Sequence, residues 1–217
     1  MRPMAMLYLV AASALSAAES GPGTLHVFGL DWQVPVREDW RVQKVDGVET
    51  LELTVPRPST QPRRPTQYAL AETEPYRKLT LELEVKQEPA AIRNRHNSLM
   101  FVYAWRDRDH FNYVHISVDA AKAQPVHNGV FHVYGGDRVR ISSEEGPAAL
   151  KDESWHKVKL VYDGDAGRVD VWVDGQTSAS LRGVDLSLGA GKFGIGSFFD
   201  MGSFRNVKVS GVKQLSH

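Results

Sequence analysis

The stretch that decides the fold is Ser154-Trp155-His156-Lys157-Val158-Lys159-Leu160-Val161-Tyr162, followed by Asp163-Gly164-Asp165-Ala166-Gly167 and then Arg168-Val169-Asp170-Val171-Trp172-Val173-Asp174-Gly175. Polar and apolar residues alternate on both sides of a short segment rich in Gly and Asp, and Asp-Gly closes the second half. Alternation on either side of such a turn is typical of a β-hairpin. The stretch therefore predicts an antiparallel β fold.

Most of the chain after residue 24 repeats this alternation. The predicted strands are 24–28, 50–55, 66–71, 78–86, 98–105, 111–118, 130–134, 138–142, 155–162, 168–173, 192–197 and 203–209. Gly, Pro, Asn or Asp separate them, and the proline-rich segment 56–65 predicts an extended loop. Many short strands with frequent turns predict an all-β fold, a two-sheet antiparallel β-sandwich of the jelly-roll type.

The first residues have the composition of an export signal. Arg2 is followed by the apolar run 4–15 and by the small residues Ser16-Ala17-Ala18. The apolar run is shorter than the ~20 residues that a membrane-spanning helix needs. We expect residues 1–18 to be a signal peptide, residues 19–217 to form a single β-sandwich domain, and the protein to be secreted or periplasmic.

Composition excludes several function classes. The 217 residues contain 26 basic and 26 acidic side chains, and these are scattered rather than clustered, which argues against a nucleic-acid partner. The chain has no cysteine, so disulfides, thiolate metal sites and cysteine nucleophiles are absent. No phosphate-binding loop, dinucleotide fingerprint or Gly-x-Ser-x-Gly motif is present.

Alternation in the central strands predicts which side chains leave the core. Val114 and Ile116 alternate with Tyr113 and His115, so the aliphatic pair is expected inside and the other pair outside. The same reasoning assigns these residues to the core: Met100, Val102, Ala104, Phe131, Val133, Val139 and Ile141. It predicts an outward set on neighbouring strands: Phe101, Tyr103, Trp105, Tyr113, His115, Ser117, His132, Tyr134, Arg138 and Arg140.

Flat rings and forked donors are the side chains that stack on sugar rings and bond to their hydroxyls. The outward set therefore predicts a binding platform for a carbohydrate or glycoside. The expected stacking residues are Tyr103, Trp105, Tyr113 and Tyr134. The expected hydrogen-bonding residues are Arg95, Asn97, His115, His132 and Arg140. Aromatic residues also favour strands for packing reasons alone, so a platform covered by a loop at 56–65 or 93–97 is the alternative.

Several segments resemble known families. The hairpin resembles the Trp-His-x-Val and Val-x-Val-Asp-Gly pattern of the concanavalin A-like lectin/glucanase (laminin-G-like) superfamily, which mostly handles carbohydrate. Segments 192–198 and 202–209 resemble the closing strands of the 3-keto-disaccharide hydrolase family, formerly a domain of unknown function. Asn97-Ser98 resembles its Asn-Ser-Gly motif, with Leu99 in place of glycine. The resemblance covers roughly residues 51–209 and implies the jelly-roll fold.

The same resemblance implies two alternatives to simple sugar binding. One is a hydrolase acting on a (3-keto-)disaccharide or related glycoside, with His115, His132 and Asp109 as candidate catalytic residues. The other is a non-catalytic adhesion module with a protein partner. The Glu-x-Asp-x-x-Glu motif of laminarinases is absent. The sequence therefore does not decide whether the protein is an enzyme.

No cofactor is expected to be required. The superfamily often holds structural calcium, and Asp31 and Asp200 are the candidate ligands. Arg205 and Asn206 stand where calcium-binding relatives often carry Asp. Glu82 and Glu84 share one face of a predicted strand and are expected to form its solvated side.

Overall fold

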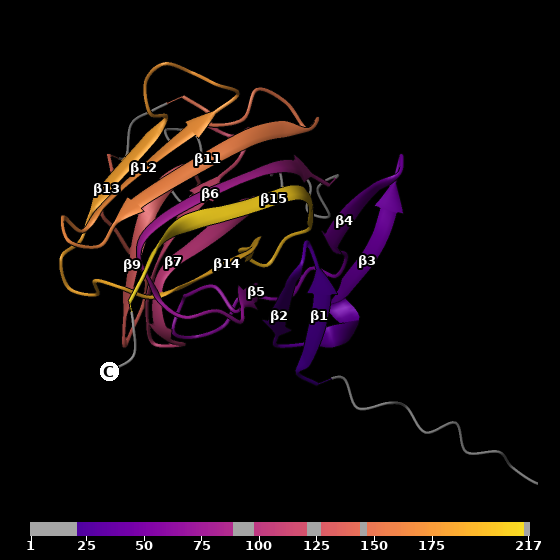
Figure 1. Cartoon of the computed structure of the whole chain (residues 1–217), viewed down its shortest axis with the longest axis horizontal. Coiled ribbons are helices and arrows are strands. Elements are labelled where there is room, and N and C mark those ends of the chain that lie inside the picture. Colours follow the sequence, from indigo (N-terminus) through magenta and orange to yellow (C-terminus); the bar gives the residue numbers. More distant parts are fainter. Residues whose placement is uncertain (1–20, 89–97, 121–126, 144–146, 215–217) are drawn as a thin grey trace, which may run out of the picture.

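A computed structural model of the protein describes residues 21–88, 98–120, 127–143 and 147–214. Their strands form two antiparallel sheets packed face to face, and one 3-10 turn, Arg37–Asp39, precedes the third strand. The confirmed architecture is the predicted β-sandwich. Figure 1 shows β13, β12, β11, β6 and β15 side by side in one layer, with the β1–β4 strands at one end of the molecule.

The first sheet, sheet A, has eight strands. In spatial order they are β1 (Gly23–Val27), β2 (Leu30–Val34), β5 (Gln67–Ala71), β14 (Lys192–Ser197), β7 (Leu99–Asp107), β8 (His110–Ile116), β9 (Gly129–Tyr134) and β10 (Val139–Arg140).

The second sheet, sheet B, has seven strands. In spatial order they are β13 (Leu181–Val184), β12 (Arg168–Val173), β11 (His156–Asp163), β6 (Tyr76–Gln87), β15 (Gly202–Lys213), β4 (Val48–Leu53) and β3 (Trp40–Val45).

All twelve predicted strands are present within a few residues of their expected bounds, whereas β2, β3 and β13 were not predicted. The sequence feature that could have revealed the β3–β4 hairpin is the Asp46-Gly47 turn between the two strands. In the structure both turn residues have positive φ values, 51° and 80°. Such a turn joins a tight hairpin. The expected export signal lies outside the described residues and stays a prediction. The described residues contain no helix that is long and apolar enough to cross a membrane.

The main core lies between the two sheets. Strand β6 alternates along its length, with Leu79, Leu81 and Leu83 buried and Glu82 exposed. The opposing contribution from sheet A includes Phe101. Because side chains alternate across a strand, the charged residues of β6 are directed to the outer surface of sheet B.

A second apolar cluster, here called the outer cluster, lies on the other face of sheet A. Its buried members are Met100, Val102, Phe111, Tyr113, Phe131, Val133, Phe198 and Phe199. The central strands of sheet A are therefore buried on both faces. This arrangement makes alternation ambiguous, because apolar residues occupy both sets of positions.

Two of the predicted face assignments are wrong for this reason. In β7, Phe101 and Tyr103 face the main core, whereas Met100 and Val102 belong to the outer cluster. In β9, Val130 faces the main core, and Phe131 and Val133 face outward.

A bulge in β7 and the rim of the sandwich produce further departures from simple alternation. Ala104 has a positive φ of 50°, and the pairing registers of β7 shift around it. Ala104 is in the main core as expected, and Trp105 stays on the outer side. Val139, expected inside, is 57% exposed, whereas Ile141 packs against the main core.

The hairpin that decided the fold is fixed by its own motif residues. Asp174 and Gly175 have φ values of 51° and 69°, and the turn closes with Gln176 N donating to Val173 O at 3.2 Å. The Asp174 carboxylate accepts from Lys157 N at 2.9 Å and lies 2.7 Å from His156 Nδ1. The His of the Trp-His pair therefore anchors the Asp of the Asp-Gly turn.

The other ring nitrogen of His156 lies 2.9 Å from Asp152 O and 3.2 Å from its carboxylate. Burial lowers the pKa of His156, but the contacts with Asp174 and Asp152 outweigh burial, so its pKa stands above the usual 6.5. A histidine with a raised folded-state pKa stabilises the fold below its unfolded-state pKa. That contribution is lost as the pH rises through the folded-state pKa.

We expect the His156→Gln variant to lose more stability at about pH 6 than at about pH 9, because only the protonated imidazole gains charge-assisted bonds to the two aspartates. Urea unfolding of both proteins at the two pH values measures this difference. An equal stability loss at both pH values would show that the ring acts only by packing.

Candidate functional site

The predicted platform on sheet A is closed. Tyr113 is fully buried and His115 is 1% exposed. The Tyr113 ring lies nearly parallel to Phe131 and Phe198, with centroids 5.1 and 6.3 Å away. Burial raises the pKa of Tyr113, as expected for a phenol enclosed by aromatic rings. These residues do face away from the main core, but they belong to a second packed interior.

Arginine side chains and a loop cover this interior. Arg138 lies 4.0 Å from the Phe198 ring centroid and donates from Nη1 to Tyr113 Oη at 2.9 Å. Its backbone N–H bonds to Arg63 O, which belongs to the proline-rich segment, and Arg63 N donates to Asp137 Oδ1 at 2.6 Å. The alternative of a face covered by the 56–65 loop is therefore correct for this region.

Other predicted ligand residues are also committed to internal contacts. Tyr103 is fully buried with its ring 4.8 Å from that of Tyr162, and burial raises its pKa. Trp105 is half-buried and donates from Nε1 to Tyr68 Oη at 3.0 Å. Arg140 lies over Phe131 and donates to three backbone carbonyls. Arg95 and Asn97 lie outside the described residues.

The candidate calcium ligands do not form a site. Asp31 pairs with His26 on the β1–β2 hairpin. Asp200 is buried and accepts from Ser98 N at 3.1 Å and Ser98 Oγ at 2.7 Å. The described part of the chain has no group of three or more His, Asp or Glu placed to hold a metal ion. These donors therefore do not fit the ion.

One predicted catalytic residue, His132, lies at an open rim of the sandwich, where β9 faces the segment after β13. Its Nδ1 is 2.9 Å from Asp185 Oδ2 and 3.1 Å from Asn112 Oδ1. Both neighbours of Nδ1 are acceptors, so Nδ1 carries the proton and Nε2 is left as the basic nitrogen. No described residue bonds to Nε2, and the side chain is 20% exposed.

Asp185 is itself held from several directions. Asn112 Nδ2 donates to its Oδ2 at 2.8 Å, and Ser187 N donates to its Oδ1 at 2.8 Å. Burial works to raise the pKa of Asp185, but the bonds from Ser187, Asn112 and His132 outweigh burial and lower it. The carboxylate is thus ionised and fixes the orientation of His132.

Tyr134 extends this rim. It is 59% exposed and its ring stacks on His132 with centroids 5.5 Å apart. The His110 ring packs edge-on against Tyr134 with centroids 4.6 Å apart, and His110 Nδ1 lies 2.9 Å from Asp107 Oδ1. Of the three predicted catalytic residues, His115 is buried in the outer cluster, and the Asp109 carboxylate pairs with Arg64. Asp109 is accessible but committed to a cation, whereas His132 is oriented by its neighbours and keeps one ring nitrogen unbonded among the described residues.

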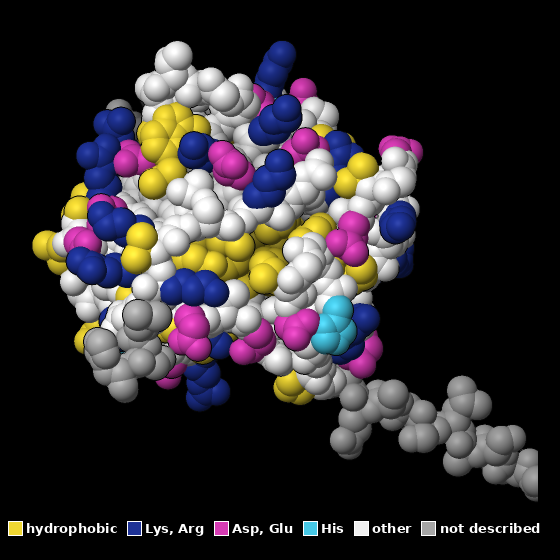
Figure 2. Space-filling view, in the orientation of Figure 1, with side chains coloured by type: hydrophobic (Ala, Val, Ile, Leu, Met, Phe, Trp, Pro, Cys, Tyr) yellow, Lys and Arg dark blue, Asp and Glu magenta, His cyan; other side chains and the backbone are white. Residues whose placement is uncertain are grey.

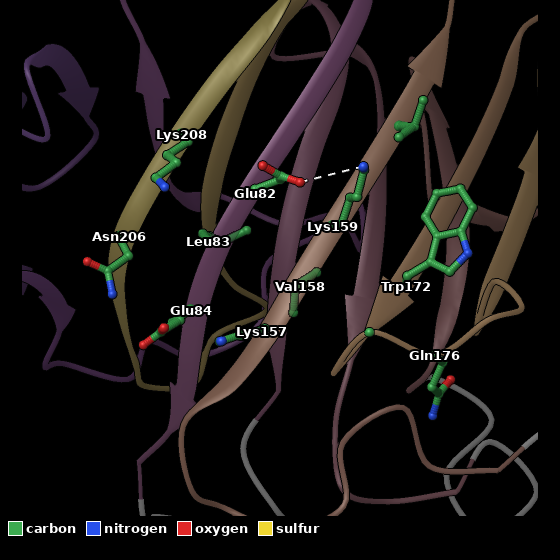
Figure 3. Close-up of a pocket in the computed structure, with 12 residues that line it drawn as sticks. Glu82, Leu83, Glu84, Lys157, Val158, Lys159, Trp172, Gln176, Asn206 and Lys208 are labelled. Atoms are coloured by element: carbon green, nitrogen blue, oxygen red, sulfur yellow. Dashed lines mark ion pairs between the residues drawn. The ribbon is translucent and has the colours of Figure 1, made fainter.

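A hollow on the outer face of sheet B measures about 850 Å³. It crosses β15, β6, β11 and β12, and we call it the sheet-B groove (Figure 3). Its lining residues are Glu82, Leu83, Glu84, Lys157, Val158, Lys159, Val161, Trp172, Gly175, Gln176, Asn206 and Lys208.

Strand register explains the order of these side chains. Lys208, Lys159 and Trp172 lie in one cross-strand row with Glu82. Figure 3 shows the indole ring of Trp172 with its flat face toward the viewer, at the β12 side of the groove. Charged side chains of both signs cover β11, β6 and β15 in Figure 2. The groove therefore combines one aromatic face with a field of donors and acceptors.

Asn206 reaches the groove because of a bulge. Its φ is 54°, and the β15–β6 register shifts between Arg205 and Lys208. Arg205 lies between two partners, with its guanidinium 4.0 Å from the Trp155 ring centroid and its Nε 2.7 Å from Glu84 Oε2. The Phe-Arg-Asn-Val segment thus shapes one wall of the groove.

The sequence analysis did not select Trp172 as a site residue. The signal was available, because Trp172 alternates with Val171 and Val173 in the opening hairpin and is directed outward by that period. What the sequence did not show is that its neighbours across the sheet leave a hollow rather than a flat surface.

A family model for the 3-keto-alpha-glucoside-1,2-lyase-like domain matches residues 30–210. The chain belongs to this family. Membership confirms the predicted family resemblance and connects the jelly roll with carbohydrate. A search of curated proteins finds no match.

Several solved structures are similar to this chain at low identity. Carbohydrate-binding module CBM66 from Bacillus subtilis is 14% identical with a TM-score of 0.53, covering 79% of this chain and 95% of that chain. A galectin-like protein of unknown function from Bacillus subtilis is 14% identical (TM-score 0.49; 82% and 91% covered). The Ca²⁺/Man3GlcNAc-bound exoplasmic/lumenal domain of VIP36 is 12% identical (0.47; 84% and 89%). The likeness to CBM66 concerns the jelly-roll fold alone.

We expect Tyr113→Ala to lower the free energy of unfolding by about 3–5 kcal/mol, because it empties a packed aromatic position. Tyr134→Ala, which removes an exposed ring, should change stability by less than about 0.5 kcal/mol. Chemical denaturation of both variants measures this contrast. A Tyr113→Ala protein as stable as the wild type would contradict the packed outer cluster.

Proposed function

We propose that the protein binds a carbohydrate or glycoside in the sheet-B groove. The observation that carries the proposal is the position of Trp172 at the side of a hollow of about 850 Å³. Binding sites for small molecules usually measure about 300–1,000 Å³ and combine apolar surface with a few polar groups. A groove of this size accommodates one or two sugar rings.

The chemistry of the lining suits a sugar. The flat indole face of Trp172 can pack against the C–H surface of a pyranose, and its large apolar area supplies contact energy. Glu82 and Asn206 offer acceptors, whereas Lys159 and Asn206 offer donors, so ring hydroxyls find both kinds of partner. Strands β15, β6, β11 and β12 hold these groups on a rigid backbone.

Family membership supports the same ligand class, because the family description names a glucoside. The CBM66 likeness adds that a jelly roll of this shape occurs in a carbohydrate-binding module. Export through the predicted signal at residues 1–18 would place the groove where extracellular glycans are available. The ligand residues proposed here replace most of the platform expected from the sequence.

We expect Trp172→Ala to weaken binding to oligosaccharides at least about tenfold, because it removes the stacking surface from the groove. Isothermal titration calorimetry against a panel of neutral and acidic oligosaccharides measures this loss. Val139→Ala is the control, since it shortens an exposed apolar side chain on sheet A and should leave binding unchanged. Equal affinity of Trp172→Ala and wild type would reject the groove as the site.

A second candidate function is cleavage of a 3-keto-glucoside at the rim, and the observation that favours it is the Asp185–His132 pair. The family description names a 1,2-lyase. In such an elimination the C3 ketone acidifies the C2 proton. A base removes that proton, the C1–C2 double bond forms, and the glycosidic C1–O bond breaks with its electron pair on the leaving oxygen.

His132 has the features of that base. Its Nε2 is basic because Asp185 and Asn112 hold the proton on Nδ1, and the Asp185 carboxylate stabilises the imidazolium that forms. The protonated His132 or water then supplies the proton that the leaving oxygen needs. The exposed Tyr134 ring beside His132 offers a surface for the sugar ring.

We expect His132→Gln to reduce cleavage of an aryl 3-keto-glucoside at least about a hundredfold, the usual contribution of a positioned base. Release of the aryl alcohol measures cleavage, and loss of C2–H exchange into D₂O measures the proton step. His110→Gln, whose ring also contacts Tyr134, is the control and should retain activity. Full activity of His132→Gln would exclude this rim as a catalytic site.

A further inference from the structure

The sheet-B groove carries an excess of positive charge in a chain whose formal net charge is zero. Four cationic side chains lie in or beside it: Lys157, Lys159, Lys208 and Arg205. The two carboxylates among the lining residues belong to Glu82 and Glu84. The local excess therefore does not reflect a generally basic protein, and it points to the charge of the occupant.

Both carboxylates are already paired within the protein. Glu84 Oε2 lies 2.7 Å from Arg205 Nε, and each of these side chains is less than one-fifth exposed. Glu82 Oε1 lies 3.5 Å from Lys159 Nζ, and each of these is about half exposed (Figure 3). The first pair is fixed and partly desolvated, whereas the second can open toward a ligand.

Lys157 and Lys208 differ from these pairs. Both side chains are exposed, both line the groove, and neither forms an ion pair with a carboxylate of the described residues. Register places Lys157 opposite Glu84 on β6 and Lys208 opposite Glu82. The two ammonium groups thus lie on strands that flank β6 from opposite sides, above carboxylates that other cations already neutralise.

We infer that the groove selects an anionic sugar, a pyranose that carries a carboxylate or a sulfate, with the anion bound by Lys157 and Lys208 and the ring stacked on Trp172. This inference rests on the proposed function and names its ligand class. Lysine ammonium groups are compact donors that bind carboxylate and sulfate oxygens. A neutral sugar would stack on Trp172 but would leave both ammonium groups without a counter-charge.

Carboxylates near the groove oppose the binding of an anion. Glu82 is a half-exposed carboxylate among the lining residues, so it repels the ligand whenever Lys159 turns away. Asp174, beside the groove, is paired with His156 and accepts from Lys157 N at 2.9 Å. Asp170, beyond Val161 in the next strand, is held by Arg168 and Arg182 at 2.7 and 2.8 Å and adds no free negative charge. The preference for an anion therefore depends on Lys157 and Lys208 and is opposed by Glu82.

The test compares three ligands of equal length by calorimetry: a neutral galacto-oligosaccharide, the corresponding galacturonate oligomer and a sulfated galacto-oligosaccharide. We expect the intact protein to bind at least one anionic ligand about tenfold or more tightly than the neutral one. Raising the salt concentration toward 1 M should reduce this ratio, because the Debye length falls from about 8 to about 3 Å.

Variants assign the preference to the groove. Lys157→Gln and Lys208→Gln should each reduce the anionic-to-neutral affinity ratio while neutral binding persists, and Glu82→Gln should increase the ratio. Lys44→Gln, an exposed lysine on β3, is the control and should leave the ratio unchanged. Circular dichroism melting curves confirm that each variant is folded.

The outcomes separate the two proposals. Equal binding of neutral and anionic ligands, all of it lost in Trp172→Ala, would overturn the anionic preference while the groove remains a sugar site. A ratio that the two lysine variants leave unchanged would also overturn it. Binding of none of the ligands would overturn both proposals. Tighter binding of the uronate than of the sulfated ligand, or the reverse, identifies which anion supplies the charge.

Discussion

Burial of sheet A on both faces is the constraint on which the rest of the structure depends. Its central strands pack against sheet B on one side and fill the outer cluster on the other. Tyr113 and His115 therefore serve packing rather than recognition. Surface for a ligand remains where sheet A is not covered, at the β9–β13 rim, and on the outer face of sheet B.

Cross-strand neighbours give the sheet-B face its character. Side chains opposite one another on adjacent strands lie within contact distance, so register alone sets the row of Lys208, Glu82, Lys159 and Trp172. The bulge at Asn206 alters the β15 end of the row. A face that alternation makes merely polar becomes a groove because these rows surround a hollow.

The rim shows a different principle, in which a polar side chain is oriented by a segment from the other sheet. His132 and Asn112 belong to sheet A, and Asp185 follows β13 of sheet B. Strand packing brings the three together across 53 and 73 residues of sequence. Their mutual bonds leave one imidazole nitrogen directed away from the pair, which is the arrangement that proton transfer requires.

The sequence by itself determined the fold class, twelve of the strands and the family, because period-two alternation and turn residues are local signals. Alternation also carries the signal that Lys157 and Lys159 share one face of their strand, whereas the register that pairs Lys159 with Trp172 comes from the structure. Tertiary structure decided which faces are buried: Met100, Val102, Phe131 and Val133 are as apolar as main-core residues, so alternation could not distinguish the two interiors. The partners of His132 and the hollow beside Trp172 depend on long-range strand order, which no local pattern records.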